Sequence, residues 1–129
     1  MADYTLRNLA EVEDAAIEGG FSDNQEARFA GRDLGLGTLG LSYQIVKPGK
    51  HHAFGHRHKE IEEVYVVLEG SGTCRLDAEE VPVGRLDAIR VGPSVTRGFA
   101  ASDEGLSLLV FSERAPGDAE IVADFFSDG

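Results

Sequence analysis

The sequence predicts an all-β protein built as one domain and folded as a closed barrel or a sandwich. The chain has 129 residues, a length typical of a single domain. Its 16 glycines separate short segments in which apolar and polar residues alternate with period two, the period of a β-strand. Hydrophobic residues make up 42% of the chain and charged residues 27%, a composition typical of a globular protein and not of a disordered one.

The first segment departs from the strand pattern. Asn8 followed by Glu11 matches a capping box, and apolar residues at helical spacing follow. We therefore expect a short helix from Leu9 to Ile17, ended by the pair Gly19-Gly20.

The rest of the chain predicts short strands separated by turns. The strongest is Val64–Leu68, apolar throughout and rich in β-branched residues, and Glu69–Gly72 predicts a hairpin turn after it. The charged pairs Glu79-Glu80 and Asp103-Glu104 are expected at solvated hairpin tips. The tail from Asp118 to Phe126 is expected to form one helical turn or to lie extended against a neighbour. The other expected strands are Ala27–Ala30, Leu41–Val46, Thr73–Leu76, Glu79–Val83, Asp87–Val91, Thr96–Ala100 and Leu106–Phe111.

The net charge and the cysteine content limit which partners the protein can bind and indicate its cellular compartment. A formal net charge of −11 should repel nucleic acid and anionic membrane surfaces. Cys74 is the one cysteine of the chain, which excludes an internal disulfide and a multi-cysteine metal site, and we expect it to be a buried apolar residue. Without a long apolar run or a signal-peptide core in the sequence, we expect a cytoplasmic protein without a membrane anchor.

All four histidines of the chain lie between His51 and His58. His56 and His58 are two residues apart, so on a strand both imidazoles point to the same face, and Glu63 begins the next strand. Two imidazoles and one carboxylate form a facial ligand set that suits iron(II), manganese, nickel or zinc and leaves positions open. Strand alternation turns Glu62, the alternative carboxylate, the other way. His51 and His52 follow a Pro-Gly turn and are expected to be solvated loop residues.

The segment from Gly55 to Gly70, GHRHKEIEEVYVVLEG, resembles the first motif of the cupin family. That motif is H-x-H, then Glu after three or four residues, then Gly after six more, and this segment fits it. The resemblance implies a jelly-roll β-barrel, and the short helix expected from the capping box precedes it. The resemblance also implies one domain over residues 1–129, with the barrel core at about 39–112.

The segment from Gly84 to Ala101 resembles the second cupin motif more weakly. It keeps Gly84 and Pro93, but Arg97 stands where the family usually has a histidine, its fourth metal ligand. A guanidinium stays protonated and does not ligate a metal. Either Arg97 holds a substrate carboxylate or phosphate beside the metal, or the site has lost its metal and Arg97 pairs with Glu63.

The resemblance assigns His56, His58 and Glu63 as metal ligands and places Arg97 at the same mouth of the barrel. We expect Arg97 and Tyr65 to contact the substrate. Tyr65 shares the strand face of Glu63, so its side chain should lie inside the barrel. Two roles are open to a buried tyrosine there. It can pack with its hydroxyl satisfied, which we favour, or it can act as an acid catalyst.

The cupin fold hosts dioxygenases, isomerases, epimerases, decarboxylases and plain binding proteins, so the fold alone does not choose an activity. The intact ligand trio predicts a metal-dependent enzyme, a dioxygenase or an isomerase or epimerase, that acts on a small anionic metabolite. The alternative is a non-catalytic module that binds a small molecule without metal. A structural dimerisation domain would leave the inward histidines unexplained. We expect a homodimer that covers the apolar terminal residues Ile121, Val122, Phe125 and Phe126.

Overall fold

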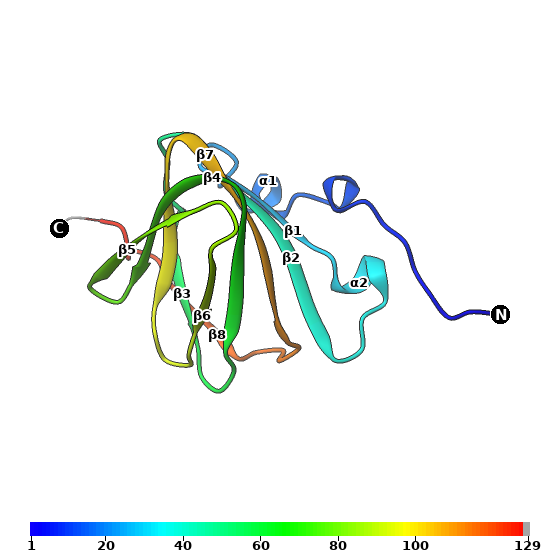
Figure 1. Ribbon diagram of the computed structural model, residues 1–129. Helices are drawn as coiled ribbons and strands as arrows, with labels where there is room; N and C mark the ends of the chain where they lie inside the picture. Colours follow the sequence, from blue (N-terminus) through cyan, green and yellow to red (C-terminus); the bar gives the residue numbers. More distant parts are fainter. Residues whose placement is uncertain (128–129) are drawn as a thin grey trace.

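The computed structural model describes residues 1–127, and in these residues eight strands form one curled antiparallel sheet (Figure 1). One path through the sheet runs β1-β2-β7-β3-β8, and β4 pairs with β5, β6 and β7. This confirms the predicted all-β barrel class. The strands are β1 (Gln25–Phe29), β2 (Leu39–Val46), β3 (Gly55–His58), β4 (Glu63–Leu76), β5 (Glu79–Gly84), β6 (Ala88–Val91), β7 (Arg97–Glu113) and β8 (Ala119–Val122).

Strands β4 and β7 are long and bent, and they close the barrel together. The hairpin turn predicted at Glu69–Gly72 is wrong, because β4 continues through it with register shifts against β7 at Val67/Glu69 and Gly70/Gly72. Gly70 has a φ of +83°, and a Cβ there would lie 1.9 Å from the carbonyl oxygen of Gly105. Glycine is required at this position because the two backbones cross closely at the bend.

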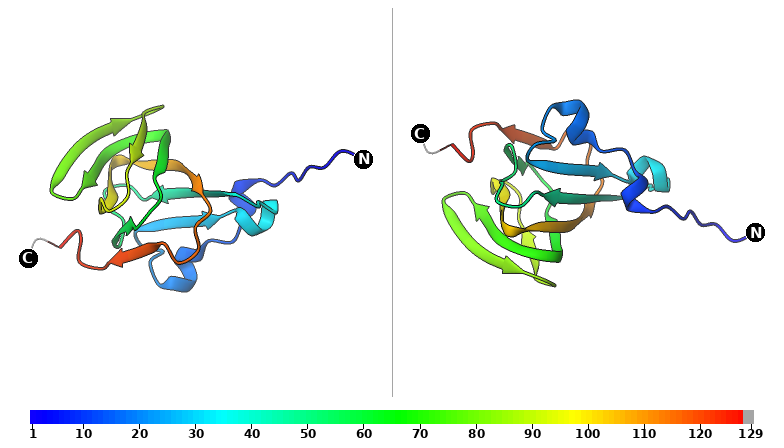
Figure 2. Two further views of the ribbon diagram at one scale, coloured as in Figure 1. Left: turned by 90° about the horizontal axis from the view of Figure 1, so that it is seen from below. Right: turned by 90° about the horizontal axis from the view of Figure 1, so that it is seen from above.

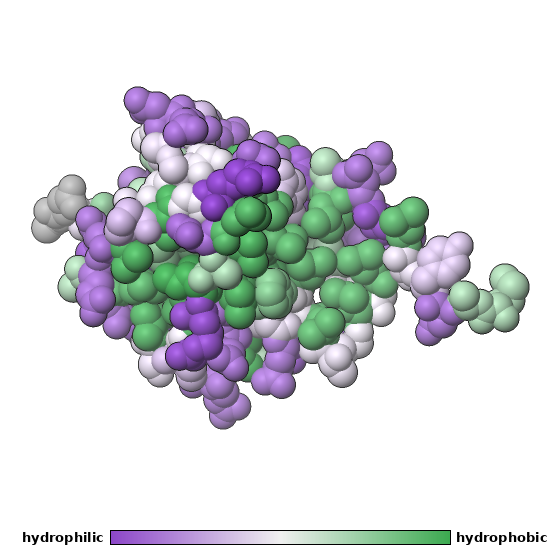
Figure 3. All heavy atoms as spheres, in the orientation of Figure 1, coloured by the Kyte–Doolittle hydropathy of each residue, from purple (hydrophilic) through white to green (hydrophobic). Residues whose placement is uncertain are grey.

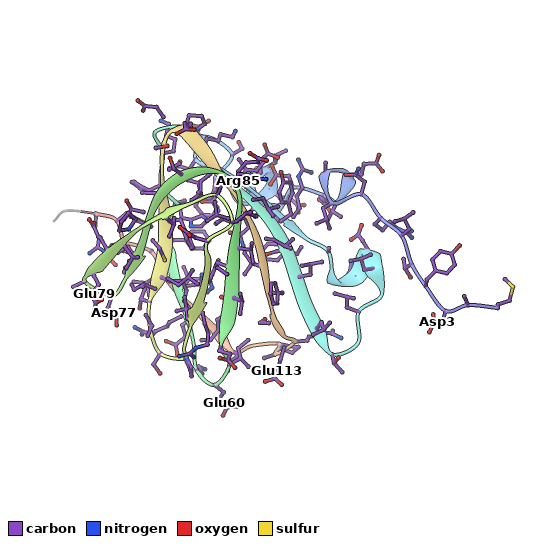
Figure 4. The ribbon with its side chains drawn as sticks, in the orientation of Figure 1. Asp3, Glu60, Asp77, Glu79, Arg85 and Glu113 are labelled. Atoms are coloured by element: carbon purple, nitrogen blue, oxygen red, sulfur yellow. The ribbon has the colours of Figure 1, made fainter. Side chains whose placement is uncertain are left out.

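The real turn after β4 lies at Asp77-Ala78. The Asp77 carboxylate accepts a hydrogen bond from the Thr96 amide at 3.0 Å, and its own amide donates to the Thr96 carbonyl. Figure 4 shows Asp77 and Glu79 at the tip of the β4–β5 hairpin, where Glu79 and Glu80 are exposed as predicted. Asp103 and Glu104 are also exposed, but they lie within β7 because the two strands predicted there form one continuous strand.

The short N-terminal helix predicted at Leu9–Ile17 is present as two separate helical pieces, with Asn8 as the N-cap of the first and Gly20 as the C-cap of the second. The chain forms a 3₁₀ turn at Leu9–Glu11, labelled η1, and then the α-helix α1 at Ala15–Gly19. Asp14 separates them: its carboxylate accepts from the amides of Ala16 and Ala27, which caps α1 and attaches it to β1. A further helical turn, α2 (Gly31–Leu34), was not predicted.

The C-terminal segment combines the two predicted alternatives: Ala119–Val122 lies extended against its own barrel as β8, and residues 123–126 form a turn. Strand β8 pairs antiparallel with β3 and follows the wall of the barrel (Figure 2). Phe125, which comes after β8, is buried. A Cβ at Gly55 would lie 2.5 Å from the Phe125 ring, so glycine makes room for this contact. Phe125 therefore needs no second subunit to cover it, whereas Ile121 remains exposed.

The barrel interior holds one apolar cluster made from several strands. Cys74 is buried in it, as predicted, and burial raises the pKa of its thiol to about 12. Within residues 1–127, none of the helices has the length and apolar character needed to cross a membrane. The buried cluster comprises Val46, Tyr65, Val67, Cys74, Val83, Val91, Phe99, Leu106, Leu108 and Val110.

Candidate metal centre and cavity

The predicted ligand trio comes together on the inner wall of the barrel. Strand β3 carries His56 and His58 on one face, and Glu63 is the first residue of β4. One potential ligand atom from each residue lies within 4.8 Å of the other two. Glu62, the other carboxylate considered, is exposed and pairs with Arg90 at 3.2 Å. Strand alternation thus separates the two glutamates as predicted.

Glu63 is the centre of the hydrogen bonds at this site. Its Oε1 lies 3.0 Å from His56 Nε2 and accepts from the Tyr65 hydroxyl at 2.7 Å, while Oε2 lies 3.3 Å from His58 Nε2. Burial alone would raise the pKa of Glu63. The bonds to His56 and Tyr65 and the nearby imidazoles outweigh burial and lower that pKa to about 2. Glu63 is therefore an anion at neutral pH.

Arg97 lies beneath this carboxylate with its side chain fully buried. Its Nη1 donates to Glu63 Oε1 at 3.2 Å, and its Nη2 donates to the Gly92 carbonyl at 2.9 Å. Among the described residues, no acceptor reaches its Nε. The guanidinium therefore pairs with Glu63, as one predicted alternative requires, and keeps one buried donor free. The role of Arg97 as an anion contact stays a prediction.

Tyr65 is 1% exposed, and its hydroxyl donates to Glu63. Burial raises the pKa of Tyr65 well above its usual value, and the Glu63 charge raises it further. The phenol therefore stays protonated, packed and hydrogen-bonded, the arrangement favoured from the sequence. Its contact with a substrate stays a prediction.

Asp118 is a site residue that sequence reasoning missed. Its Oδ2 lies 3.3 Å from His58 Nδ1, close enough for attraction although not aligned as a hydrogen bond. The carboxylate also accepts from the amides of Glu60 and Ile61. Burial would raise the pKa of Asp118, but these amide bonds and His58 lower it. An acidic group behind a ligand histidine is a common support of metal sites, but no motif marks Asp118 in the sequence.

The trio opens onto a cavity of about 340 Å³ inside the barrel. Its lining includes His56, His58, Glu63, Tyr65 and Arg97. Many of the other lining groups are apolar, and α1 contributes Ala15 and Ala16. The volume is at the lower end of the range for small-molecule sites.

His52 contradicts the prediction that it is a solvated loop residue. It is 7% exposed, lines the cavity and is bonded at both ring nitrogens. Burial lowers its pKa to about 3, with smaller contributions from His56 and His51, so the ring is neutral. His51 is exposed, as predicted. One signal for a polar site nearby was present in the sequence, since Ser42 and Gln44 occupy the inward positions of a predicted strand.

Together, the fold and the trio define a cupin-type barrel with a candidate metal centre, and comparison with known proteins agrees. The family model described as "Cupin domain" matches residues 42–112, so the chain belongs to the cupin family. None of the curated proteins matches the chain significantly.

Solved structures share the fold at low sequence identity. A cupin protein from Bacteroides fragilis superposes with a TM-score of 0.71 and 22% identity, covering 91% of this chain and 89% of its own. A variant of Streptomyces PAC13 solved with uridine has a TM-score of 0.71 and 20% identity, covering 95% and 93%. A putative sugar phosphate isomerase from Acidithiobacillus ferrooxidans has a TM-score of 0.61 and 22% identity, covering 77% and 76%.

Proposed function

We propose that this cupin is a metal-dependent enzyme that acts on a small anionic metabolite. The observation that carries the proposal is the trio of His56, His58 and Glu63, whose ligand atoms gather within 4.8 Å at the wall of an internal cavity. Open coordination positions toward a cavity are typical of catalytic rather than purely structural metal sites.

The residues fit a divalent transition metal. His58 has Asp118 behind its Nδ1, which favours an Nε2 lone pair on the side of Glu63. Glu63 is ionised, and within residues 1–127 the one polar partner of its Oε2 is His58. Iron, manganese, nickel or zinc suits two imidazoles and a carboxylate. Such an ion would polarise a carbonyl or activate dioxygen, which corresponds to an isomerase or epimerase in one case and a dioxygenase in the other.

The charge of the site favours an anionic substrate. A divalent ion and Arg97 together exceed the charges of Glu63 and Asp118 by one positive charge. A buried excess of this kind is stabilised by an anion, and the free Nε of Arg97 offers a donor to it. Sugar phosphates, the substrates that the Acidithiobacillus ferrooxidans protein's description implies, belong to this chemical class.

The second candidate is a non-catalytic module that binds a small molecule without metal. The observation that favours it is the pairing of Glu63 with Arg97 and Tyr65, which neutralises and satisfies the carboxylate without any ion.

Elemental analysis of tag-free protein, purified without chelator, tests the two candidates. We expect about one equivalent of transition metal in the wild type and in His51→Ala, whose exposed imidazole is the matched control. His58→Ala should lose most of the metal and stay folded. Added metal should raise the melting temperature of the wild type but not that of His58→Ala. Absence of metal binding in the wild type would favour the binding module.

We also propose a homodimer formed through the outer face of β2, β4 and β7. Cross-strand pairing places Val64, Phe111 and Leu41 in one row, and Val66 and Leu109 in the next row. Figure 3 shows apolar surface across the middle of this face. Two copies could cover it with an isologous contact.

Light scattering tests this dimer. We expect twice the 13.8 kDa of one chain for the wild type. Phe111→Glu on β7 should give the monomer, whereas Leu86→Glu, at an exposed apolar residue of the turn between β5 and β6, should not change the mass. A wild-type mass of one chain at tens of micromolar would contradict the proposal.

The acidic charge of the chain and its single, buried cysteine guide the remaining proposals. From the single buried cysteine we propose that the protein resides in the cytoplasm. From the net charge of −11 we propose that its partners are small molecules and not nucleic acid or membranes.

A further inference from the structure

A chain of hydrogen bonds lies on the wall of the cavity, outside the metal trio. The Phe99 amide donates to His52 Nδ1 at 3.0 Å, and His52 Nε2 lies 3.1 Å from Gln44 Oε1. Gln44 Nε2 donates to the Ser42 hydroxyl oxygen at 3.1 Å. His52, Gln44 and Ser42 all line the cavity.

The backbone fixes the direction of this chain. An amide N–H can only donate, so His52 Nδ1 must be unprotonated, and the neutral ring carries its proton on Nε2. That proton must go to the carbonyl oxygen of Gln44, which turns the Gln44 amide nitrogen toward Ser42. The Ser42 hydroxyl therefore accepts one bond and keeps its own proton to donate. No acceptor for this proton is present among residues 1–127, although Ser42 is only 5% exposed.

Gln25 adds a donor of the same kind. Its Oε1 accepts from the Ala53 amide at 2.8 Å, so its amide nitrogen is the end left for the cavity, which Gln25 also lines. Strand β1 pairs with β2 and places Gln25 close to Gln44 in the sheet. Three side chains of this wall thus offer donors whose orientation their own partners determine.

We infer that Ser42, Gln44 and Gln25 form a second polar subsite, which binds an uncharged acceptor oxygen of the ligand. This rests on the proposed function for the other polar group of the ligand, an anionic group that meets the trio and Arg97. The ligand class is therefore a small carboxylate or phosphate compound that also carries a carbonyl oxygen. The apolar side chains that line the same cavity, including Phe54 and Phe21, suit a flat or apolar body.

Matched pairs of aromatic acids test the subsite. The probes are 4-acetylbenzoate and 3-acetylbenzoate, each compared with the isopropyl compound in which a methyl group replaces the carbonyl oxygen. The corresponding 1-aminoethyl compounds present a cation that can only donate. Titration calorimetry of the metal-loaded wild type should show at least one acetyl compound binding about 3- to 10-fold more tightly than its isopropyl partner. The aminoethyl compounds should bind most weakly.

Two variants of the subsite should remove this preference. Ser42→Ala deletes the terminal donor. Gln44→Glu replaces the amide nitrogen beside Ser42 with a carboxylate oxygen. The Ser42 hydroxyl then donates its proton to this oxygen and not to the ligand. Both should bring the acetyl and isopropyl affinities within about twofold of each other. Ser107→Ala, on β7 away from the cavity lining, is the matched control and should keep the preference. Thermal melts identify any variant that fails to fold.

The outcomes separate the two proposals. If the acids bind and Arg97→Lys weakens both members of a pair, but acetyl and isopropyl affinities are equal in the wild type, the subsite is wrong and the anion site stands. Preference retained in Ser42→Ala and Gln44→Glu also overturns the subsite. If none of the acids binds the metal-loaded protein, both the subsite and the anionic ligand are contradicted.

Discussion

Mild acid should destabilise the protein mainly through His52. The ring is buried, accepts from the Phe99 amide and donates to Gln44, so a second proton would break the first of these bonds. Its pKa falls from 6.5 in an unfolded chain to about 3 in the fold. Because the unfolded chain takes up the proton first, falling pH favours unfolding. The stabilisation is complete above about pH 6.5 and decreases steadily below it.

The size of the effect follows from this pKa difference. A pH of 4.5 lies about two units below the pKa of His52 in the unfolded chain and still above its pKa in the fold. Protonation of the unfolded chain therefore lowers the free energy of unfolding by roughly 3 kcal/mol at this pH. That is a large part of the 5–15 kcal/mol typical of a domain. Glu63, with its pKa lowered to about 2, adds its own loss only below about pH 4.5, so above that pH the loss from His52 is measured without it.

Urea unfolding of metal-free protein between pH 7.5 and 4.5 measures this loss. His52→Gln should be less stable than the wild type at pH 7.5 but should lose much less stability on acidification. His51→Gln, at the exposed neighbour, should behave as the wild type. If His52→Gln does not fold, NMR titration of the wild type replaces it, and the His52 ring should not titrate above pH 4.5. Equal acid losses in wild type and His52→Gln, or a ring pKa near 6.5, would refute the reasoning.

Two further predictions concern the C-terminal segment. Asp118→Asn should weaken metal binding about 10- to 100-fold in a chelator competition, whereas Glu120→Gln should not, because Glu120 pairs with Arg57 instead of His58; equal affinities would remove Asp118 from the site. Gly55→Ala should lower the free energy of unfolding in urea by about 1–3 kcal/mol, because its Cβ would overlap the Phe125 ring. Gly84→Ala adds its Cβ to open space and is the control, so equal losses in both variants would contradict the overlap.

The sequence predicted the centre of the site well because its residues are close together in the chain. His56 and His58 share a strand face by simple alternation, and Glu63 follows after a short loop. The motif then located the trio without knowledge of the barrel. Arg97 was found by its place in the second motif. The sequence could not decide whether Arg97 contacts a substrate anion or Glu63. That contact depends on the fold, which brings β7 beside β3 and pairs Arg97 with His56 in register.

The missed features depend on contacts between distant segments. Asp118 reaches His58 only because β8 adds to the edge of β3. The bend of β4 depends on Gly70 meeting Gly105, and a glycine followed by polar residues resembles a hairpin turn when only the local sequence is considered. The predicted N-terminal helix begins too early, because α1 starts only after Asp14. The position of Asp14 as the cap is fixed by its bond to the Ala27 amide of β1. His52 is buried because its ring bonds to Gln44 of β2 and to the Phe99 amide of β7, a strand that is distant from it in the sequence.

The charged groups and the donor groups of the cavity come from different segments, and this separates ligand recognition from metal binding. The charged groups belong to β3, the start of β4 and the start of β7. The donor groups belong to β1 and β2, next to His52 in the loop between β2 and β3. The donor residues are not members of the trio, so substitutions there can change the preferred ligand while the metal ligands stay in place. The cupin fold hosts many activities, and in this chain β1, β2 and the loop that carries His52 are the segments where such specificity would be set.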